Sequence, residues 1–350
     1  MSTELFIIAE AGSNWRSGAY ARDRQMGQAL IEGAAEAGAD AVKFQMYRAA
    51  TVYAPNAGAY EGHCGQDLED IGKTFEDLEM STTLLEEFSQ HAARCNIEFM
   101  CTPFSVEDLA AVDPHVRRHK MASYEMLHLR IWEAMIRTEK PVIFSTGGFT
   151  LADVDRILDW LVSQNAPIEL YTVMHCVASY PAELSSLGLD VLRTMKERFG
   201  RRGLQVGYSD HSLDPVVAPA AAVALGATCI EKHFTLNRHL PGPDHPFAIE
   251  VPELVRMVKA CRETFAAVEE HEEKGTGPAE KKLQRFAHRA LQAIRDVAAG
   301  DILREGENFA ILRPGNNSQG ASPLEIDRIE GRRANVSIPR GGGILTSNVE

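Results

Sequence analysis

The feature that most constrains the fold is a regular alternation of short apolar segments with segments of helical periodicity. Candidate strands begin near Leu5, Asp40, Ile97, His119, Pro141, Glu169, Leu204 and Thr228. Most of them are followed by a segment in which apolar residues recur every three or four positions, as on the buried face of a helix. Eight such repeats are the number in a (β/α)8 TIM barrel, so the sequence predicts an α/β fold of that type.

The sequence predicts where several of these segments begin and end. One helix is expected from about residue 24 to residue 37, and residues 83–86 have the sequence of a capping box at the start of another. The last helix of the barrel is expected over residues 252–270. Residues 49–79 are rich in glycine, aspartate and tyrosine and interrupt the alternation, so they are expected to form a long loop over the active-site end.

Two histidines stand at matched positions, His211 and His233, each directly after a predicted strand. The segment from Pro215 to Gly226 reads as a helix with proline in its first turn and glycine just past its end. In a parallel sheet both histidines would lie at the same carboxyl edge, where two imidazoles can hold a divalent metal ion. Two unrelated histidines, one buried and one solvated, would leave the same pattern.

Most of the other predicted strand ends also carry polar residues, which is what the catalytic face of a barrel requires. They are Glu10, Lys43, Gln45, Thr102, Lys120, Ser123, Glu125, Ser145, Thr146, His175, Ser209 and Glu231. An ammonium group is costly to bury without an anion, so Lys43 and Lys120 inside apolar strands indicate a phosphate or carboxylate ligand. The turn at residues 145–148 precedes a helix, whose free backbone N–H groups can cradle phosphate.

Composition restricts the partners and the compartment. The formal net charge of -13 argues against nucleic acid and anionic membrane surfaces as partners, so an anionic substrate needs a locally basic pocket. No apolar run approaches the length of a membrane span or a signal sequence, which favours a cytoplasmic protein. The six cysteines include no C-x-x-C pair and are expected to be reduced core thiols.

The residue composition of the chain changes after residue 270. Residues 271–282 are charged and contain glycine and proline, as in an exposed connection, so a boundary is expected near residue 282. This gives a catalytic barrel over residues 1–282 and a second module over residues 283–350. The second module consists of short alternating runs at residues 290–294, 309–312 and 334–338, separated by Gly-Asp, Pro-Gly and Pro-Arg-Gly turns. This pattern predicts a small β-rich domain that docks on the barrel or on a partner subunit.

Short motifs along nearly the whole chain carry a family resemblance. They lie at residues 7–14, 41–45, 102–104, 120–125, 145–147, 175–176, 180–181, 209–211, 231–235 and 241–244. Together they resemble the sialic acid synthase family, and Arg313-Pro314-Gly315 resembles the arginine motif of that family's C-terminal antifreeze-protein-like (β-clip) domain. The resemblance implies that a divalent metal ion, with Mn²⁺ expected and Mg²⁺ or Co²⁺ as alternatives, assists a condensation of phosphoenolpyruvate. The other substrate would be an open-chain amino or deoxy sugar aldehyde, and the products a 2-keto-3-deoxy nonulosonic acid and phosphate.

The resemblance also implies roles for individual residues. His211 and His233 would hold the metal, and one of the acidic residues Glu10 and Glu125 would activate the water that attacks C2 of the intermediate. Phosphoenolpyruvate and the sugar would contact Lys43, Gln45, Thr102, Lys120, Ser123, Ser145, Thr146, Gly147, Ser209 and Asp244. Arg313 would reach the sugar from the other subunit of a domain-swapped homodimer.

Departures from the family pattern concern the sugar. Trp15 replaces a common histidine, Ala178 stands where a polar residue is usual, and residues 316–319 lengthen the loop after the arginine motif. We expect altered sugar recognition, with precursors of pseudaminic, legionaminic and other nonulosonic acids open. Two other classes also remain open: a metal-independent aldolase with Lys43 or Lys120 as a Schiff-base lysine, and a non-catalytic carbohydrate-binding or ice-binding protein.

Overall fold

The computed structural model describes residues 4–63, 66–68, 70–268 and 274–350. The chain divides into two compact units, residues 1–269 and residues 270–350. None of the helices within the described ranges has the length and the apolar composition that a bilayer crossing requires. Five cysteines in these ranges are free thiols, and Cys64 lies outside the described residues.

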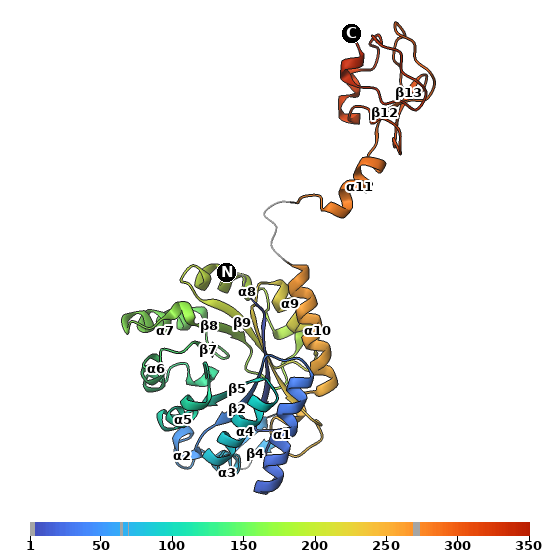
Figure 1. The fold of residues 1–350 in the computed structure, drawn as a ribbon. Helices are drawn as coiled ribbons and strands as arrows, with labels where there is room; N and C mark the ends of the chain where they lie inside the picture. Colours follow the sequence, from blue (N-terminus) through green and yellow to red (C-terminus); the bar gives the residue numbers. More distant parts are fainter. Residues whose placement is uncertain (1–3, 64–65, 69, 269–273) are drawn as a thin grey trace. The chain divides into compact units, whose positions relative to one another are not determined.

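The first unit is built on eight parallel strands that form a nearly closed barrel (Figure 1). Their pairing order is β5-β2-β1-β10-β9-β8-β7-β6, and the end strands β5 and β6 lie beside each other. The strands are β1 (Phe6–Gly12), β2 (Ala41–Met46), β5 (Glu98–Pro103), β6 (His119–Met121), β7 (Val142–Ser145), β8 (Thr172–Cys176), β9 (Gln205–Asp210) and β10 (Cys229–Thr235). A two-residue strand, β11 (Ile249–Glu250), pairs with β10. All eight strands predicted from the sequence are confirmed.

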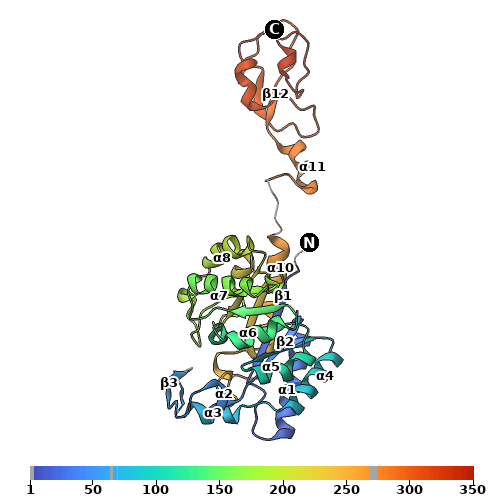
Figure 2. The ribbon, with the colours of Figure 1, turned by 90° about the vertical axis from the view of Figure 1, so that its left-hand side faces the viewer.

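Helices surround the barrel in the two views of Figures 1 and 2. They are α1 (Tyr20–Glu36), α4 (Thr82–Arg94), α5 (Val106–Val112), α6 (Leu129–Ile136), α7 (Leu151–Ser163), α8 (Val191–Gly200), α9 (Val217–Ala224) and α10 (Val251–Ala267). The predicted capping box at residues 83–86 is wrong, because the N-cap of α4 is Ser81, two residues before Thr83, and Ser81 Oγ accepts the backbone N–H of Leu84. Pro215 likewise precedes α9 instead of standing in its first turn.

The excursion at residues 49–79 is more structured than the predicted loop. It contains α2 (Ala49–Val52), an antiparallel hairpin of β3 (Tyr60–His63) and β4 (Gln66–Leu68), and α3 (Ile71–Asp77). Asp70 caps α3 by accepting the backbone N–H of Lys73. These elements are short, so no hydrophobic period develops that would reveal them in the sequence.

The barrel interior changes from apolar to polar along the strands. A small apolar cluster fills its lower layer: Ile8, Ala41, Met100, Ile143, Met174 and Cys229. Side chains two positions apart on a strand point to the same face. The next inward positions are therefore Glu10, Lys43, Thr102, Ser145, Cys176 and Glu231, all of which are buried. The site thus rests directly on a packed core at the carboxyl end of the barrel.

The second unit is a small β-rich domain with its own core. It contains α11 (Pro278–Ala287) and the antiparallel strands β12 (Ala290–Ala293) and β13 (Phe309–Leu312), both at predicted positions. Residues 334–338, the third predicted run, make only isolated bridges. The division between the two units lies at residue 269, before the boundary expected near residue 282, and α11 therefore belongs to the second unit.

Candidate active site

A cavity of about 710 Å³ opens at the carboxyl end of the barrel. Twelve of the residues predicted from the sequence line it: Glu10, Lys43, Gln45, Thr102, Lys120, Ser123, Glu125, Ser145, Ser209, His211, His233 and Asp244. Thr146 and Gly147 lie behind this lining, where the Thr146 hydroxyl donates to Met174 O at 2.9 Å and the Gly147 N–H donates to Ser123 Oγ at 3.0 Å. Arg313 belongs to the second unit.

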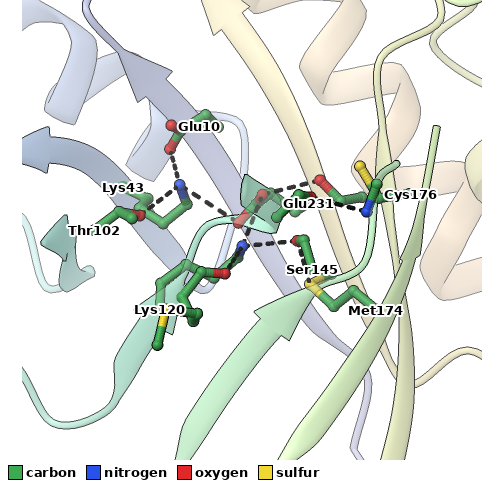
Figure 3. A network of polar contacts seen from close by, with 12 residues as sticks. Glu10, Lys43, Thr102, Lys120, Ser145, Met174, Cys176 and Glu231 are labelled. Atoms are coloured by element: carbon green, nitrogen blue, oxygen red, sulfur yellow. Dashed lines mark hydrogen bonds and ion pairs between the residues drawn. The ribbon is translucent and has the colours of Figure 1, made fainter. Parts of the chain in front are cut away.

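Four ionisable residues form the floor of the cavity, and we call them the lysine–glutamate cluster: Glu10, Lys43, Lys120 and Glu231 (Figure 3). Lys43 Nζ lies 2.7 Å from Glu10 Oε2 and 3.6 Å from Glu231 Oε2. Lys120 Nζ lies 3.7 Å from Glu231 Oε1. Two ammonium groups therefore face two carboxylates in a region where every member is at least 96% buried.

Hydroxyl and amide groups complete the contacts of the cluster. The two ammonium groups donate to Thr102 Oγ1 at 3.2 Å from Lys43 and to Ser145 Oγ at 2.7 Å from Lys120. The carboxylates accept from neighbouring strands, Glu10 from Gln45 Nε2 at 2.7 Å and Glu231 from Ser209 Oγ at 3.0 Å. Each of these contacts joins neighbouring strands, whereas the Lys120–Glu231 ion pair joins β6 to β10 across the barrel interior (Figure 3). Closure of the barrel therefore brings the two halves of the cluster together.

The two carboxyl groups of the cluster differ in acidity. Burial raises the pKa of Glu10 to about 7, against the opposing effect of the Lys43 ammonium. Burial also acts to raise the pKa of Glu231, but Lys120 and Lys43 outweigh it and bring the value to about 2. Glu231 faces two ammonium groups, whereas Glu10 contacts one. Glu10 is therefore the carboxyl group of the cluster that can exchange a proton near neutral pH.

Glu231 ends a predicted strand, but the sequence alone indicates no role for it in the site. The signal that identifies it is its spacing from His233, because residues two apart on β10 point to the same face. The intervening Lys232 points to the other side, where its Nζ donates to Asp210 Oδ2 and to Ser212 O, both at 2.5 Å. Asp210 also accepts the backbone N–H of Ser212 at 2.9 Å, so this buried pair fixes the turn that carries His211.

The two histidines lie together at the rim of the cavity, with ring centroids 5.6 Å apart. His211 Nδ1 donates to Val177 O at 2.8 Å, which leaves its Nε2 as the available lone pair. His233 Nδ1 is buried without a hydrogen-bond partner among the described residues, and burial holds the pKa of His233 well below its usual range. Burial acts to lower the pKa of His211, but the neighbouring Cys176 thiol outweighs it and raises the pKa. In their neutral forms, two imidazoles fit the donor set of a divalent transition metal.

These imidazoles do not form part of a larger ligand cluster. Within the part of the chain that the structure describes, no group of three or more histidine, cysteine, aspartate or glutamate side chains is placed to hold a metal ion. A metal ion bound here would therefore keep positions open for substrate or water, as a catalytic site requires.

The open end of the cavity includes Asp244 and Glu125. Asp244 Oδ2 accepts from the backbone N–H of Ser13 at 3.0 Å and from its hydroxyl at 2.8 Å. Gly12 has φ +52°, and a Cβ at this position would lie 2.6 Å from Asp244 Oδ2, so only glycine allows this approach. Burial raises the pKa of Glu125, which brings its carboxyl group closer to the acid–base range.

Two of the residues that depart from the family pattern, Ala178 and Trp15, lie in different places in the structure. Ala178 lines the cavity, in agreement with the expectation of altered contacts there. Trp15 does not line it: the indole is buried in the barrel core, edge to face with Phe88 at 6.3 Å between ring centroids. The indole therefore does not face the cavity, and the expected effect of Trp15 on sugar recognition stays a prediction.

Comparison with known proteins gives matches over both units. The NeuB family model matches residues 30–273 and the SAF domain model matches residues 288–350. The spore coat polysaccharide biosynthesis protein SpsE of Bacillus subtilis is 35% identical, over 99% of this chain and 93% of SpsE. The N,N'-diacetyllegionaminic acid synthase of Campylobacter jejuni is 32% identical, over 95% of this chain and 96% of that protein.

A solved structure is also similar. The crystal structure of N-acetylneuraminic acid (sialic acid) synthetase from Leptospira borgpetersenii, in complex with citrate, matches with a TM-score of 0.69 and 27% identity. The match covers 81% of this chain and 91% of that chain. The bound citrate is an anion with several carboxylates.

Proposed function

We propose that this chain, which belongs to the NeuB family, condenses phosphoenolpyruvate with the open-chain form of an amino or deoxy sugar aldehyde. Membership of the family makes the chain an enzyme of the sugar acid synthase class. The product of the proposed reaction is a 2-keto-3-deoxy nonulosonic acid, with release of phosphate.

One observation carries this proposal: a single cavity holds two buried ammonium groups at its floor and two imidazoles at its rim. The ammonium groups of Lys43 and Lys120 match an anionic substrate, and an acidic protein needs such a pocket to bind one. The imidazoles of His211 and His233 match the electrophile. An anion site next to an electrophile site is the arrangement that a condensation of these two substrates requires.

The residues of the cavity suggest how the reaction proceeds. Lys43, Lys120, Ser123 and Ser145 would hold the phosphate and the carboxylate of phosphoenolpyruvate. Carbon C3 then attacks the aldehyde carbon, whose oxygen takes up a proton and becomes a hydroxyl, while positive charge develops at C2. Water adds to C2, and a carboxylate, Glu10 or Glu125, takes its proton. The bond between C2 and the oxygen of the phosphate group then breaks, the C2 hydroxyl loses its proton to the departing phosphate, and the keto group remains. A divalent ion on the two imidazoles would supply Lewis-acid polarisation of the aldehyde oxygen.

A phosphate-release assay tests the function. Phosphoenolpyruvate is incubated with a panel of hexose and hexosamine aldehydes in the presence of Mn²⁺, and inorganic phosphate is measured. Release that depends on both substrates supports the proposal. The absence of release with every aldehyde overturns it. A covalent adduct trapped by borohydride on Lys43 or Lys120 would instead identify a Schiff-base aldolase.

The metal is tested by binding as well as by activity. We expect Mn²⁺ to bind the purified enzyme, as measured by the loss of its free-ion electron paramagnetic resonance signal, and His211→Ala or His233→Ala to weaken that binding at least 10-fold. Turnover should disappear with chelator and return with Mn²⁺. Full turnover in chelator, or unchanged Mn²⁺ binding in both variants, contradicts the assignment.

We also propose that Arg313 completes the site of the partner barrel in a two-fold dimer, on the basis of the family resemblance. The test mixes Arg313→Ala with His211→Ala, each inactive alone. Random reassembly makes half of the dimers mixed, and each mixed dimer has one intact site, so about a quarter of the normal activity should return. If subunits exchange and no activity returns, the arm acts within its own chain.

A further inference from the structure

The two candidate metal ligands are held in different ways. His211 Nδ1 donates to Val177 O at 2.8 Å, so a hydrogen bond fixes the orientation of that ring. Neither ring nitrogen of His233 makes a hydrogen bond to a residue that the structure describes, and its Nδ1 is buried. A metal-binding histidine is usually oriented by a hydrogen bond from its second ring nitrogen. The orientation of His233 must therefore come from packing.

Aromatic rings supply this packing. Among the described residues three rings contact His233, and Phe247 is the nearest, edge to face with 4.8 Å between ring centroids. The His211 ring follows at 5.6 Å and the Tyr180 ring at 6.5 Å. Phe247 also packs against Tyr180 at 5.1 Å, and Tyr180 in turn lies 4.2 Å from His211. One group of four rings thus contains both imidazoles.

The segment that carries Phe247 is attached to the strand that carries His233. Before Phe247, His245 Nδ1 shares a hydrogen bond of 2.7 Å with Thr235 Oγ1 at the end of β10. After Phe247, the short strand β11 pairs with the same end of β10. The Phe247 side chain between these two attachments is 2% exposed. The backbone therefore fixes the ring of Phe247 relative to that of His233.

Tyr180 and Phe247 differ in their access to the substrates. Tyr180 is among the described residues that line the catalytic cavity, whereas Phe247 is not. A substitution at Tyr180 would change the cavity wall and the packing of the histidines together. A substitution at Phe247 acts on the site through the packed rings, so it tests the packing separately.

From these contacts we propose that Phe247 is a positioning residue of the metal site: its ring holds the His233 imidazole in the orientation in which a divalent ion binds. This inference rests on the proposed function, because it takes His211 and His233 as the metal ligands. A smaller side chain at position 247 leaves space in which the imidazole can rotate. Metal binding must then also restrict that rotation, which lowers the affinity.

The experiment measures Mn²⁺ binding to the purified enzyme without substrates, from the loss of the free-ion electron paramagnetic resonance signal. We expect Phe247→Ala to weaken this binding about 5-fold, the order that follows when binding must also fix one side chain. Phe247→Leu keeps most of the apolar volume and should weaken it less. The matched control is Phe199→Ala on α8, which removes an equally buried ring that lies outside the cavity and contacts neither histidine. Its Mn²⁺ affinity should equal that of the wild type.

Steady-state kinetics separates positioning from a general disturbance of the barrel. In Phe247→Ala the Mn²⁺ concentration for half-maximal activity should rise about 5-fold. Saturating Mn²⁺ should restore kcat, and the KM for phosphoenolpyruvate should stay within about 2-fold of the wild-type value. Urea unfolding of the Phe247 and Phe199 variants shows whether the two substitutions lower the stability to a similar extent.

Each outcome decides the inference. Mn²⁺ binding by Phe247→Ala within about 2-fold of the wild type overturns it, as does equal weakening in Phe199→Ala or a kcat that stays low at saturating Mn²⁺. If the alanine variants do not fold, Phe247→Leu and Phe199→Leu form the deciding pair: weaker Mn²⁺ binding in the first supports the inference, and equal binding overturns it. If the wild-type enzyme itself binds no Mn²⁺, the proposed metal assignment fails and this inference fails with it.

Discussion

Replacement of Lys43 by methionine tests whether the lysine–glutamate cluster is held together by charge balance. The ammonium group lies 2.7 Å from Glu10 and 3.6 Å from Glu231, and the Lys43 side chain is 4% exposed. Removal of one partner from a buried ion pair costs roughly 3–5 kcal/mol of unfolding free energy. The pKa of Glu10 is already about 7, so protonation of Glu10 removes part of the unpaired charge that the substitution leaves. We therefore expect Lys43→Met to lower the unfolding free energy by about 3 kcal/mol at pH 7.

The pH dependence of this loss gives a sharper test than its size. The pKa of Glu10 is raised in the folded state, and loss of Lys43 raises it further. Below pH 7 both folded proteins keep this proton, so their difference in stability is nearly constant. Above pH 7 the folded wild-type protein releases the Glu10 proton, whereas the folded variant retains it. The folded variant then binds more protons than the unfolded variant, so its stability falls as the pH rises. The stability deficit of Lys43→Met relative to the wild type should therefore grow by about 1.4 kcal/mol per pH unit.

Urea unfolding followed by tryptophan fluorescence measures this quantity for the barrel alone. All three tryptophans of the chain, Trp15, Trp132 and Trp160, lie in the first unit. Lys259→Met on α10, where the side chain is 74% exposed, is the matched control and should change the stability by less than about 0.5 kcal/mol. The double variant Lys43→Met with Glu10→Gln should lose the pH slope. A small, pH-independent deficit, or a slope that persists in the double variant, would refute the reasoning.

Three further predictions follow from named contacts. Lys120→Met should raise the KM for phosphoenolpyruvate at least ~10-fold and that for the sugar less, because a charge-assisted contact to an anion is worth roughly 1.5–3 kcal/mol; equal changes in steady-state kinetics would contradict the anion assignment. Burial lowers the pKa of His119 to about 4, so the unfolded state binds more protons at this group between pH 6.5 and 4, and His119 should contribute a loss of about 2 kcal/mol between pH 7 and pH 5. Glu10, with its raised pKa, gains stability over the same range, so the quantity to measure by urea titration is the difference between the wild type and His119→Gln. That difference should shift by about 2 kcal/mol in favour of the variant from pH 7 to pH 5, and an unchanged difference would exclude His119 as its source. Asp210→Asn leaves the Lys232 ammonium buried without its anion, so we expect roughly 3 kcal/mol lower stability and weaker Mn²⁺ binding through displacement of His211; unchanged Mn²⁺ affinity would contradict the positioning role.

The barrel could be predicted because its strands are buried on both faces and therefore read as continuous apolar runs. The polar residues at the ends of these runs could be assigned to one face for the same reason: parallel strands bring their carboxyl ends to one edge. This is why Lys43 and Lys120, which are 77 positions apart, were expected in one pocket, and both line the cavity.

The partners of these groups were not predictable in the same way. Nothing in the sequence near Lys43 indicates that Glu231 lies 3.6 Å from it, because that contact depends on which strands face each other across the barrel interior. Trp15 follows a motif of polar and small residues, yet its indole turns into the core beside Phe88. The aromatic wall of the cavity, where Phe75 contacts Tyr47 and Tyr53, was also not predictable, since the short elements of residues 49–79 have no hydrophobic period and these rings meet only in the folded chain.

The charge balance of the cluster finally assigns different tasks to the two candidate catalytic carboxylates. Two ammonium groups already face two carboxylates, so the binding of an anion with charge on both phosphate and carboxylate adds uncompensated negative charge unless one carboxyl group takes up a proton. Glu10 is that group, because it has one ammonium contact and a pKa of about 7, whereas Glu231 has two. In the proposed reaction, a Glu10 that is protonated in the complex would act as an acid, and Glu125 would then be the group that activates water. Calorimetric titration with phosphoenolpyruvate in buffers of different ionisation enthalpy should detect this proton at pH 7.5, and binding without proton uptake would return Glu10 to the role of base.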